Sequence, residues 1–129
     1  MSKERNIFAV CDLEVEYAYH FMEYLGKKKN IPFEIRVFTS AEAFLKFVSE
    51  HPVEILLISE KAMCDEIQEQ KIRQIMILSE GMIPENLRQY PSIYKYQSSN
   101  QVIREALACY GEKCQEQTDT LKMEKKKMD

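Results

Sequence analysis

Acidic, hydroxyl and amine side chains follow the apolar runs of this sequence. Each run has the length of a buried β-strand, and polar residues stand at or just past its carboxyl end. In open sheets of parallel strands, ligands bind outside these carboxyl ends. A carboxylate, hydroxyls and an ammonium group that meet there could hold a ligand or support a reaction. The residues concerned are Cys11-Asp12, Ser59-Glu60, Ser79-Glu80 and Lys95.

Familiar catalytic and ligand-binding motifs are missing from the sequence. The glycines Gly26, Gly81 and Gly111 are isolated, so no glycine-rich phosphate loop is present. The four cysteines form no CxxC pair, and His20 and His51 have no zinc-like spacing to them. We therefore expect reduced thiols and, in this chain, no metal, no cofactor and no catalytic residue.

Five short apolar runs are predicted to be β-strands. Three of them are almost uninterrupted, which is typical of central parallel strands that are covered on both faces. The run at 33–38 alternates between apolar and polar residues, which favours an edge position. The predicted strands cover residues 6–10, 33–38, 54–59, 75–78 and 93–96.

Helical patterns separate the strands. Thr39 with Glu42 and Ser98 with Gln101 form capping boxes, and Gly111 is a natural helix stop. The polar segment 60–74 predicts only a short or poorly packed helix. The predicted helices cover residues 13–29, 40–50, 60–74, 84–90 and 98–111.

This alternation predicts an α/β fold with right-handed crossovers and helices on both faces of a parallel sheet. The natural arrangement is a flavodoxin-like three-layer sandwich with strand order 2-1-3-4-5. We expect one domain over residues 1–111. Residues 112–129 are poor in apolar side chains and are expected to be a polar linker or a C-terminal helical extension.

The bulk composition excludes several classes of protein. The 129 residues carry a net charge of -3, which does not suggest a nucleic-acid-binding surface. No apolar segment is long enough for stable membrane insertion, and no secretory signal precedes the first strand. A cytoplasmic protein is therefore expected.

The polar residues at the strand ends resemble the phosphorylation site of response-regulator receiver domains, over about residues 6–110. That family has an acidic pair after the first strand and a phosphoaccepting Asp after the third. A Ser or Thr follows its fourth strand, and a Lys lies in its fifth. By position, Cys11-Asp12 corresponds to the acidic pair and Ser59 to the phosphoacceptor, while Ser79 and Lys95 match the last two positions.

Two departures from this pattern imply an atypical receiver without aspartyl phosphorylation. Ser59 lacks the carboxylate that would be nucleophile and metal ligand, and the thiol of Cys11 is a poor ligand for a hard Mg²⁺ ion. We expect Asp12 to cap the first helix and to pair with Lys95. Ser79 is expected to accept bonds from loop amides, and Ser59 to be satisfied by backbone or by Lys95.

The segment IYKYQSSNQVIREAL, around the fifth strand, resembles the amino-terminal receiver of TadZ/CpaE-type pilus-assembly ATPases. In that family a degenerate receiver precedes a ParA/MinD-like ATPase that localises the Tad (Flp) pilus machinery. The resemblance implies a non-catalytic domain whose ATPase would follow residue 129. It also implies pilus-assembly or polar-localisation partners, with recruitment to the cell pole or the inner membrane face.

Receiver domains commonly associate through the face built by the fourth helix, fifth strand and fifth helix, so a homodimer is expected here. Two alternatives stay open: a signalling receiver with a displaced phosphosite, and a flavodoxin-like binder of a small ligand. The candidate interface is rich in tyrosine and arginine, which are enriched at protein interfaces. It comprises Arg88, Tyr90, Tyr94, Tyr96, Ile103 and Tyr110.

Overall fold

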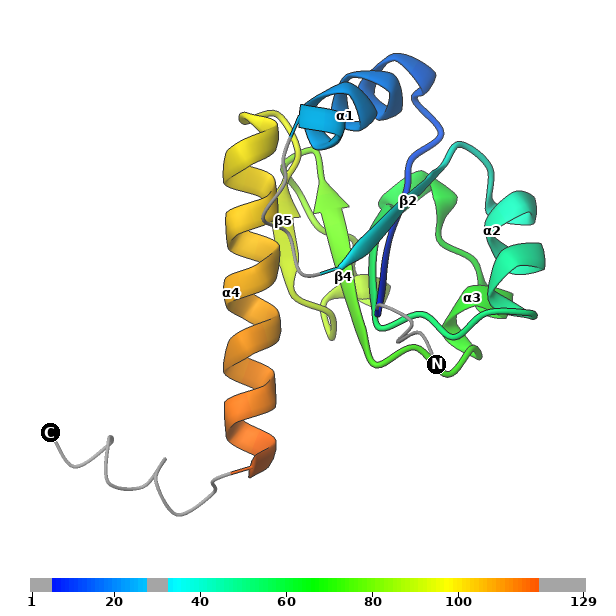
Figure 1. The fold of residues 1–129 in the computed structure, drawn as a ribbon. Coiled ribbons are helices and arrows are strands. Elements are labelled where there is room, and N and C mark those ends of the chain that lie inside the picture. The colour runs from blue at the N-terminus through cyan, green and yellow to red at the C-terminus, as the bar shows by residue number, and fades with distance from the viewer. Residues whose placement is uncertain (1–5, 28–32, 119–129) are drawn as a thin grey trace, which may run out of the picture.

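A five-stranded parallel sheet forms the centre of the protein, with helices on both of its faces (Figure 1). The computed structural model describes residues 6–27 and 33–118. The strands follow the order β2-β1-β3-β4-β5, and every neighbouring pair is parallel. The predicted flavodoxin-like architecture and its strand order are confirmed.

The five strands lie where they were predicted, with small shifts at their ends, whereas the helices differ more. The strands are β1 (Ile7–Cys11), β2 (Glu34–Phe38), β3 (Ile55–Ser59), β4 (Gln74–Ser79) and β5 (Ser92–Tyr94). The α-helices are α1 (Val15–Lys27), α2 (Ala41–Val48), α3 (Asp65–Gln68) and α4 (Ser99–Thr118). Two 3₁₀ turns, η1 (Glu60–Ala62) and η2 (Glu85–Leu87), complete the described elements.

Alternation along the central strands builds two separate cores. In β3, Ile55 and Leu57 join a cluster with α1 and α4, whereas Leu56 and Ile58 join a cluster with α2 and α3. Successive side chains of a strand point to opposite faces, so a strand that is apolar at every position is buried from both sides. Ser59 ends β3 at the next position, where the apolar run stops.

Helix α2 begins one residue later than its predicted capping box. The N-cap is Ser40, whose hydroxyl accepts the backbone N–H of Ala43 at 3.0 Å, so the assignment of Thr39 as the cap is wrong. Ser40 has the extended backbone that an N-cap requires, and its side chain reaches the free N–H three residues on. The second predicted cap is confirmed, because Ser98 accepts the N–H of Gln101 at 3.1 Å.

The segment 60–74 contains little helix, as predicted, but a buried side chain packs it against the core. It forms η1 and the single turn of α3, and Ile67 of that turn is completely buried. One fully buried side chain anchors this otherwise polar connection to the core.

The connection between β4 and β5 forms no α-helix, although residues 84–90 were predicted to be one. Only the 3₁₀ turn η2 forms, between Pro84 and Pro91. Pro91 cannot donate a helical N–H and disfavours helical geometry in the residue before it, so the turn cannot lengthen. Ser92 and Tyr94 of β5 are consequently exposed, while Ile93 is buried against α4.

Helix α4 continues through Gly111, which was predicted to end it, and reaches Thr118. A glycine inside a helix costs only about 1 kcal/mol relative to alanine, which the flanking turns can absorb. The helix therefore runs without a break across the predicted domain boundary at residue 111. Residues 119–129, the rest of the predicted extension, lie outside the described part of the chain.

Within the described residues, none of the helices combines the length and apolar composition that crossing a membrane requires.

Candidate functional site at the carboxyl edge of the sheet

The structure brings the predicted polar residues together at one edge of the sheet. Asp12 directly follows β1, and Lys95 directly follows β5, where its backbone N–H donates to the Ser79 carbonyl at 2.9 Å. Ser59 and Ser79 are the last residues of β3 and β4. The side chains of all four are at most 4% exposed, so this edge is a buried polar cluster and not a surface patch.

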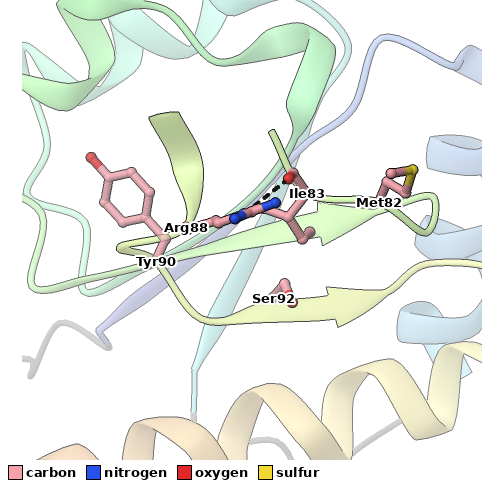
Figure 2. Close-up of a pocket in the computed structure, with 5 residues that line it drawn as sticks. All are labelled: Met82, Ile83, Arg88, Tyr90 and Ser92. Atoms are coloured by element: carbon pink, nitrogen blue, oxygen red, sulfur yellow. Dashed lines mark hydrogen bonds between the residues drawn. The ribbon is translucent and has the colours of Figure 1, made fainter. Parts of the chain in front are cut away.

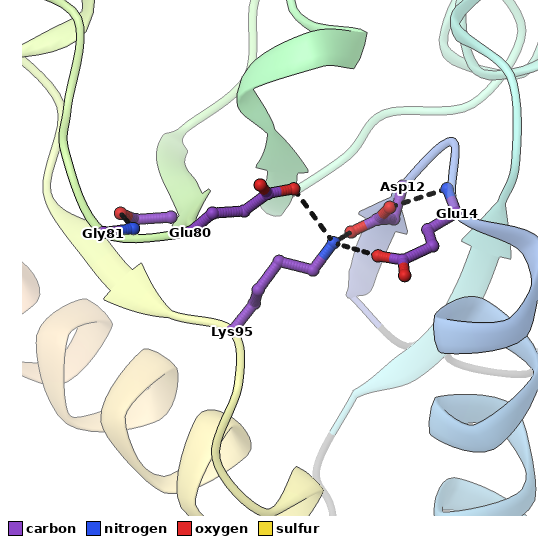
Figure 3. Close-up of polar contacts among 6 residues, drawn as sticks. Asp12, Glu14, Glu80, Gly81 and Lys95 are labelled. Carbon is purple, nitrogen blue, oxygen red and sulfur yellow. Dashed lines mark hydrogen bonds and ion pairs between the residues drawn. The ribbon is translucent and has the colours of Figure 1, made fainter.

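The ammonium group of Lys95 lies at the centre of this cluster (Figure 3). Its Nζ donates to Asp12 Oδ2 at 2.7 Å and to Glu14 Oε1 at 2.9 Å, and a carboxylate oxygen of Glu80 lies at 3.9 Å. Because β3 and β4 separate β1 from β5, the lysine side chain spans the ends of both central strands. The predicted pair of Asp12 and Lys95 is confirmed, and two further carboxylates join it.

Two aromatic rings enclose the same ammonium group. Its Nζ lies 4.5 Å from the centre of the Tyr17 ring and 5.4 Å from that of Tyr96. A cation over an aromatic face is attracted by the ring quadrupole, more strongly where water is excluded. Neither Glu14 nor Tyr17 was among the predicted site residues, because they follow Asp12 in the turn before α1 and in the first turn of α1, not at the end of a strand.

The protonation states follow from this arrangement. Burial alone would lower the pKa of Lys95, but hydrogen bonds and charge from Asp12 and Glu14 outweigh it and raise that pKa above the ordinary 10.5. The hydrogen bond from Lys95, together with its charge, lowers the pKa of Glu14. Burial is the main cause that raises the pKa of Tyr17, to about 12. At neutral pH the site therefore holds a charged lysine, a charged Glu14 and a neutral phenol.

Asp12 does not cap the first helix in the way predicted. Its Oδ1 accepts the backbone N–H of Glu14 at 2.8 Å, and α1 begins only at Val15. This carboxylate thus closes a turn ahead of the helix while its other oxygen binds Lys95. One side chain serves both the entry into α1 and the centre of the site.

The two serines at the edge differ in their hydrogen bonding. Ser79 Oγ accepts the backbone N–H of Gly81 at 2.9 Å, as predicted for this hydroxyl. Ser59 Oγ is buried and has no hydrogen-bond partner among the described residues, so its predicted bond to backbone or to Lys95 is wrong. The ammonium group of Lys95 instead donates to the carboxylates of Asp12 and Glu14.

Cys11 is a small core residue at the end of β1. It is completely buried among the apolar residues beneath α2, and its thiol donates to the Ser40 carbonyl at 3.7 Å. Burial is the main cause that raises its pKa to about 12, and the charge of Asp12 adds to it. The thiol therefore stays protonated at neutral pH.

Lys95, its carboxylate partners and Ser59 line a pocket of about 340 Å³ that opens at the sheet edge. Receiver chemistry would require Mg²⁺ here, and the residues do not fit it. The ammonium group already occupies the point where the three carboxylates converge, and Ser59 offers only a hydroxyl. Within the described residues, no cluster of three or more histidine, cysteine or acidic side chains is arranged to hold a metal ion. The lining comprises Asp12, Leu13, Glu14, Ser59, Lys61, Glu80, Lys95 and Tyr96.

A second hollow lies beside β5, where the short turn η2 replaces a helix (Figure 2). This groove of about 550 Å³ is lined by Met82, Ile83, Arg88, Tyr90 and Ser92. Arg88 lies along it, with its Nε donating to the Ile83 carbonyl at 3.4 Å. Met82 is 88% exposed at one end of the groove.

The six predicted interface residues do not share one surface. Arg88, Tyr94 and Tyr96 are exposed, and Tyr90 is partly buried at the groove. Ile103 is only 3% exposed and belongs to the core under α4, so the prediction that it lies on an interface is wrong. The partly buried Tyr110 packs against the same core and donates its hydroxyl to Glu54. The amphipathic stripe of the last helix thus faces the sheet and not a partner.

The contrast between the two serines generates a stability prediction. Replacing Ser59 with alanine should leave stability unchanged or raise it by about 1 kcal/mol, because a buried hydroxyl without a partner opposes folding. Ser79→Ala is the matched control, and it should destabilise by about 1 kcal/mol because Gly81 loses its acceptor. Urea denaturation measures both. A clear loss of stability in Ser59→Ala would show that this hydroxyl has a partner in solution.

The buried lysine generates a prediction about pH. Lys95→Met should cost about 3–5 kcal/mol near neutral pH, because it leaves Asp12 buried without its cation. Folding raises the pKa of Lys95. The contribution of its charge to the free energy of unfolding is therefore fully present below pH 10.5, and it is lost as the pH rises through the higher pKa of the folded state. The difference in unfolding free energy between the wild type and the variant should therefore shrink at alkaline pH.

Denaturation of both proteins between about pH 8 and pH 12 tests this expectation. Lys61→Met is the matched control, because Lys61 lines the same pocket but is exposed, and it should cost less than about 0.5 kcal/mol. A difference between wild type and Lys95→Met that stays constant with pH would contradict the assigned ion pair.

No protein-family model matches the sequence, and no curated protein matches it. Solved structures do resemble it. The signal receiver domain of NarL from Mycobacterium tuberculosis aligns with a TM-score of 0.62 at 13% identity, over 84% of this chain and 98% of that one.

Two further receiver domains align comparably. A response regulator receiver domain protein from Bacillus halodurans gives a TM-score of 0.58 at 20% identity, over 84% of this chain and 97% of that one. The isolated receiver domain of RcsB from Salmonella enterica serovar Typhimurium, in the presence of the phosphomimetic BeF₃⁻, gives 0.56 at 13% identity, over 82% and 87%. At such identities the likeness concerns the fold, and by its fold the chain is a receiver-like domain.

Proposed function

We propose that this receiver-like domain is a non-catalytic protein-interaction module that works without phosphorylation. The commitment of Lys95 to Asp12 and Glu14, beside a serine at the phosphoacceptor position, carries the proposal. The polar edge has become a structural ion-pair cluster, and recognition is left to the surfaces of the fold.

The chemistry of Ser59 supports this proposal. An acyl phosphate forms on a carboxylate, and a hydroxyl at this position cannot form one. The serine side chain is also only 4% exposed, so a partner kinase would have to open the edge of the sheet to reach it. Phosphorylation of Ser59 itself by a partner kinase is therefore the weaker alternative.

The groove beside β5 is the surface that best suits a protein partner in this proposal. It lies where receiver domains place their fourth helix, and it combines the exposed Met82 with the arginine Arg88 and the half-buried Tyr90. Methionine, arginine and tyrosine are all enriched at interfaces. Tyr94 and Tyr96 pack edge to face beside it, with ring centres 5.9 Å apart, and extend this surface towards the polar site.

In its finer form, the proposal places the domain at the amino terminus of a ParA/MinD-like ATPase of the TadZ/CpaE type. It would then help to localise the Tad pilus machinery to the cell pole or the inner membrane face. The resemblance of the segment IYKYQSSNQVIREAL supports this assignment. The unbroken helix α4 also supports it, because a helix that passes the end of a domain is suited to join it to another.

Phosphomimetic titration tests the absence of receiver chemistry. BeF₃⁻ with Mg²⁺ should leave the amide NMR spectrum of the protein unchanged, because the site lacks the carboxylate that would bind BeF₃⁻. A receiver domain such as that of RcsB, titrated in the same buffer, is the positive control. Shifts that cluster around Ser59 and Lys95 and saturate with BeF₃⁻ would contradict the proposal.

The reading frame downstream of Asp129 tests the finer assignment. A TadZ/CpaE-type protein should continue into an ATPase domain with a Walker A lysine. Sequencing of the transcript provides the measurement. A stop codon directly after Asp129, or a downstream domain without a phosphate-binding loop, would refute the ATPase assignment and leave the interaction module itself untouched.

A further inference from the structure

The unpaired side chain of Ser59 lines the polar pocket at the sheet edge. It is only 4% exposed, and its Oγ has no hydrogen-bond partner among the described residues. Buried polar groups in native proteins are nearly always paired, so an unpaired one requires an explanation. Two other buried side-chain oxygens, on Glu60 and Gln74, also lack a partner, but neither residue lines this pocket. The serine hydroxyl can donate one hydrogen bond and accept two, which suits it to meet a ligand.

The pocket has the size and the mixed lining of a site for a small ligand. Its volume of about 340 Å³ is at the lower end of the range of about 300–1,000 Å³ that ligand pockets span. The exposed side chains of Leu13 and Tyr96 form the apolar and aromatic part of the lining. Ligand pockets combine such walls with a few polar groups that fix the orientation of the ligand. This lining therefore suits a small molecule that has both an apolar part and polar groups.

Two opposite charges in the lining are not committed to the ion-pair cluster. Lys95 donates to Asp12 and Glu14, so these three side chains satisfy one another. Glu80 lies 3.9 Å from the same ammonium group, which is too far for a hydrogen bond. Lys61 is exposed and forms no ion pair with any residue in the described part of the chain. One carboxylate and one ammonium group are thus available to a ligand.

These two available charges lie on different sides of the cluster. Figure 3 shows Glu80 reaching Lys95 from the side opposite Asp12 and Glu14. The hydrogen bond and charge of Lys95 are the main causes that lower the pKa of Glu14, and the charge of Lys61 adds to them. Lys61 therefore lies on the Glu14 side. The pocket presents a cation towards one end and an anion towards the other.

The charges of the lining disfavour simple ions as ligands. Three carboxylates and two ammonium groups give the lining a net charge of -1, which opposes an anion such as phosphate. A simple cation would find a partner in Glu80 but would leave Lys61 without one. A zwitterion has a partner for each, because its ammonium group can meet Glu80 while its carboxylate meets Lys61.

We infer that this pocket binds an α-amino acid whose side chain is apolar. The α-ammonium group pairs with Glu80, and the carboxylate pairs with Lys61 and accepts a hydrogen bond from Ser59. The side chain of the ligand packs against Leu13 and Tyr96. The ion pairs of Lys95 stay intact, so the ligand binds in front of the structural cluster and does not replace it. The inference goes beyond the proposed interaction module, because it adds a small-molecule ligand to a protein-binding domain.

Amide NMR titration with L-leucine, to about 50 mM, tests the site on the full chain. Saturating shifts should cluster at the ends of β3 and β4 and around Tyr96, with a dissociation constant on the order of 0.1–10 mM. Isoamylamine lacks the carboxylate of leucine and isocaproate lacks its ammonium group, so they are the matched probes. Each should bind about threefold to tenfold more weakly than leucine, because each loses one ion pair.

Substitutions at the two available charges assign the two ends of the ligand. Lys61→Met and Glu80→Gln should each weaken leucine binding by about threefold to tenfold. Glu80→Gln should not weaken the binding of isocaproate, and Lys61→Met should not weaken that of isoamylamine, because each analogue lacks the group concerned. Glu85→Gln is the matched control, since Glu85 is exposed on η2 and does not line the pocket, and it should bind leucine like the wild type.

Replacement of the unpaired serine provides a third, independent measurement. Ser59→Ala should weaken leucine binding by about threefold to tenfold without any loss of stability, because the hydroxyl has a partner only when the ligand is bound. Leucine binding that survives Glu80→Gln or Lys61→Met, or an analogue that binds as tightly as leucine, would overturn the zwitterion site. A wild type without saturating shifts would overturn it as well and would leave the interaction module untouched.

Discussion

The buried ion pair between Lys95 and Asp12 is the constraint on which the carboxyl edge of this sheet depends. Desolvating a lysine and an aspartate costs several kcal/mol for each ion, and only close contact with excellent hydrogen bonding recovers it. The 2.7 Å contact, the second carboxylate of Glu14 and the ring of Tyr17 meet that requirement together. This one cluster joins the entry into α1 to the exit from β5, across the ends of the two strands between them.

The receiver-like architecture does not depend on the residues at the polar edge. A parallel sheet needs apolar strands that are covered on both faces, and β1, β3 and β4 satisfy this need whatever stands at their ends. The lysine that a phosphoryl group would engage in a receiver has found protein carboxylates as partners. Scaffold and chemistry are therefore separable here, since the cores above and below the sheet contain none of the polar site residues except the inert thiol of Cys11.

Much of this organisation can be predicted from local pattern, and the failures have physical causes. Uninterrupted apolar runs reveal the central strands and their order, and the strand ends reveal which polar groups meet. Pattern cannot decide between Thr39 and Ser40 as a helix cap, because both have a hydroxyl and only the backbone geometry chooses. It cannot show that Lys95 donates to Asp12 and Glu14 and leaves Ser59 without a partner among the described residues. An apolar helical stripe such as that of Ile103 also looks the same whether a sheet or a partner covers it.

Helix α4 has a consequence for any polypeptide attached to its carboxyl end. Its 20 residues extend about 30 Å, whereas the strands beside it, of three to six residues, span at most about 20 Å. The helix accordingly projects beyond the amino-terminal edge of the sheet, as Figure 1 shows. In this protruding part each inserted or deleted residue would turn the attached segment by about 100° and move it by 1.5 Å along the axis. The number of residues in this part of the helix thus fixes the orientation of the attached segment about the helix axis.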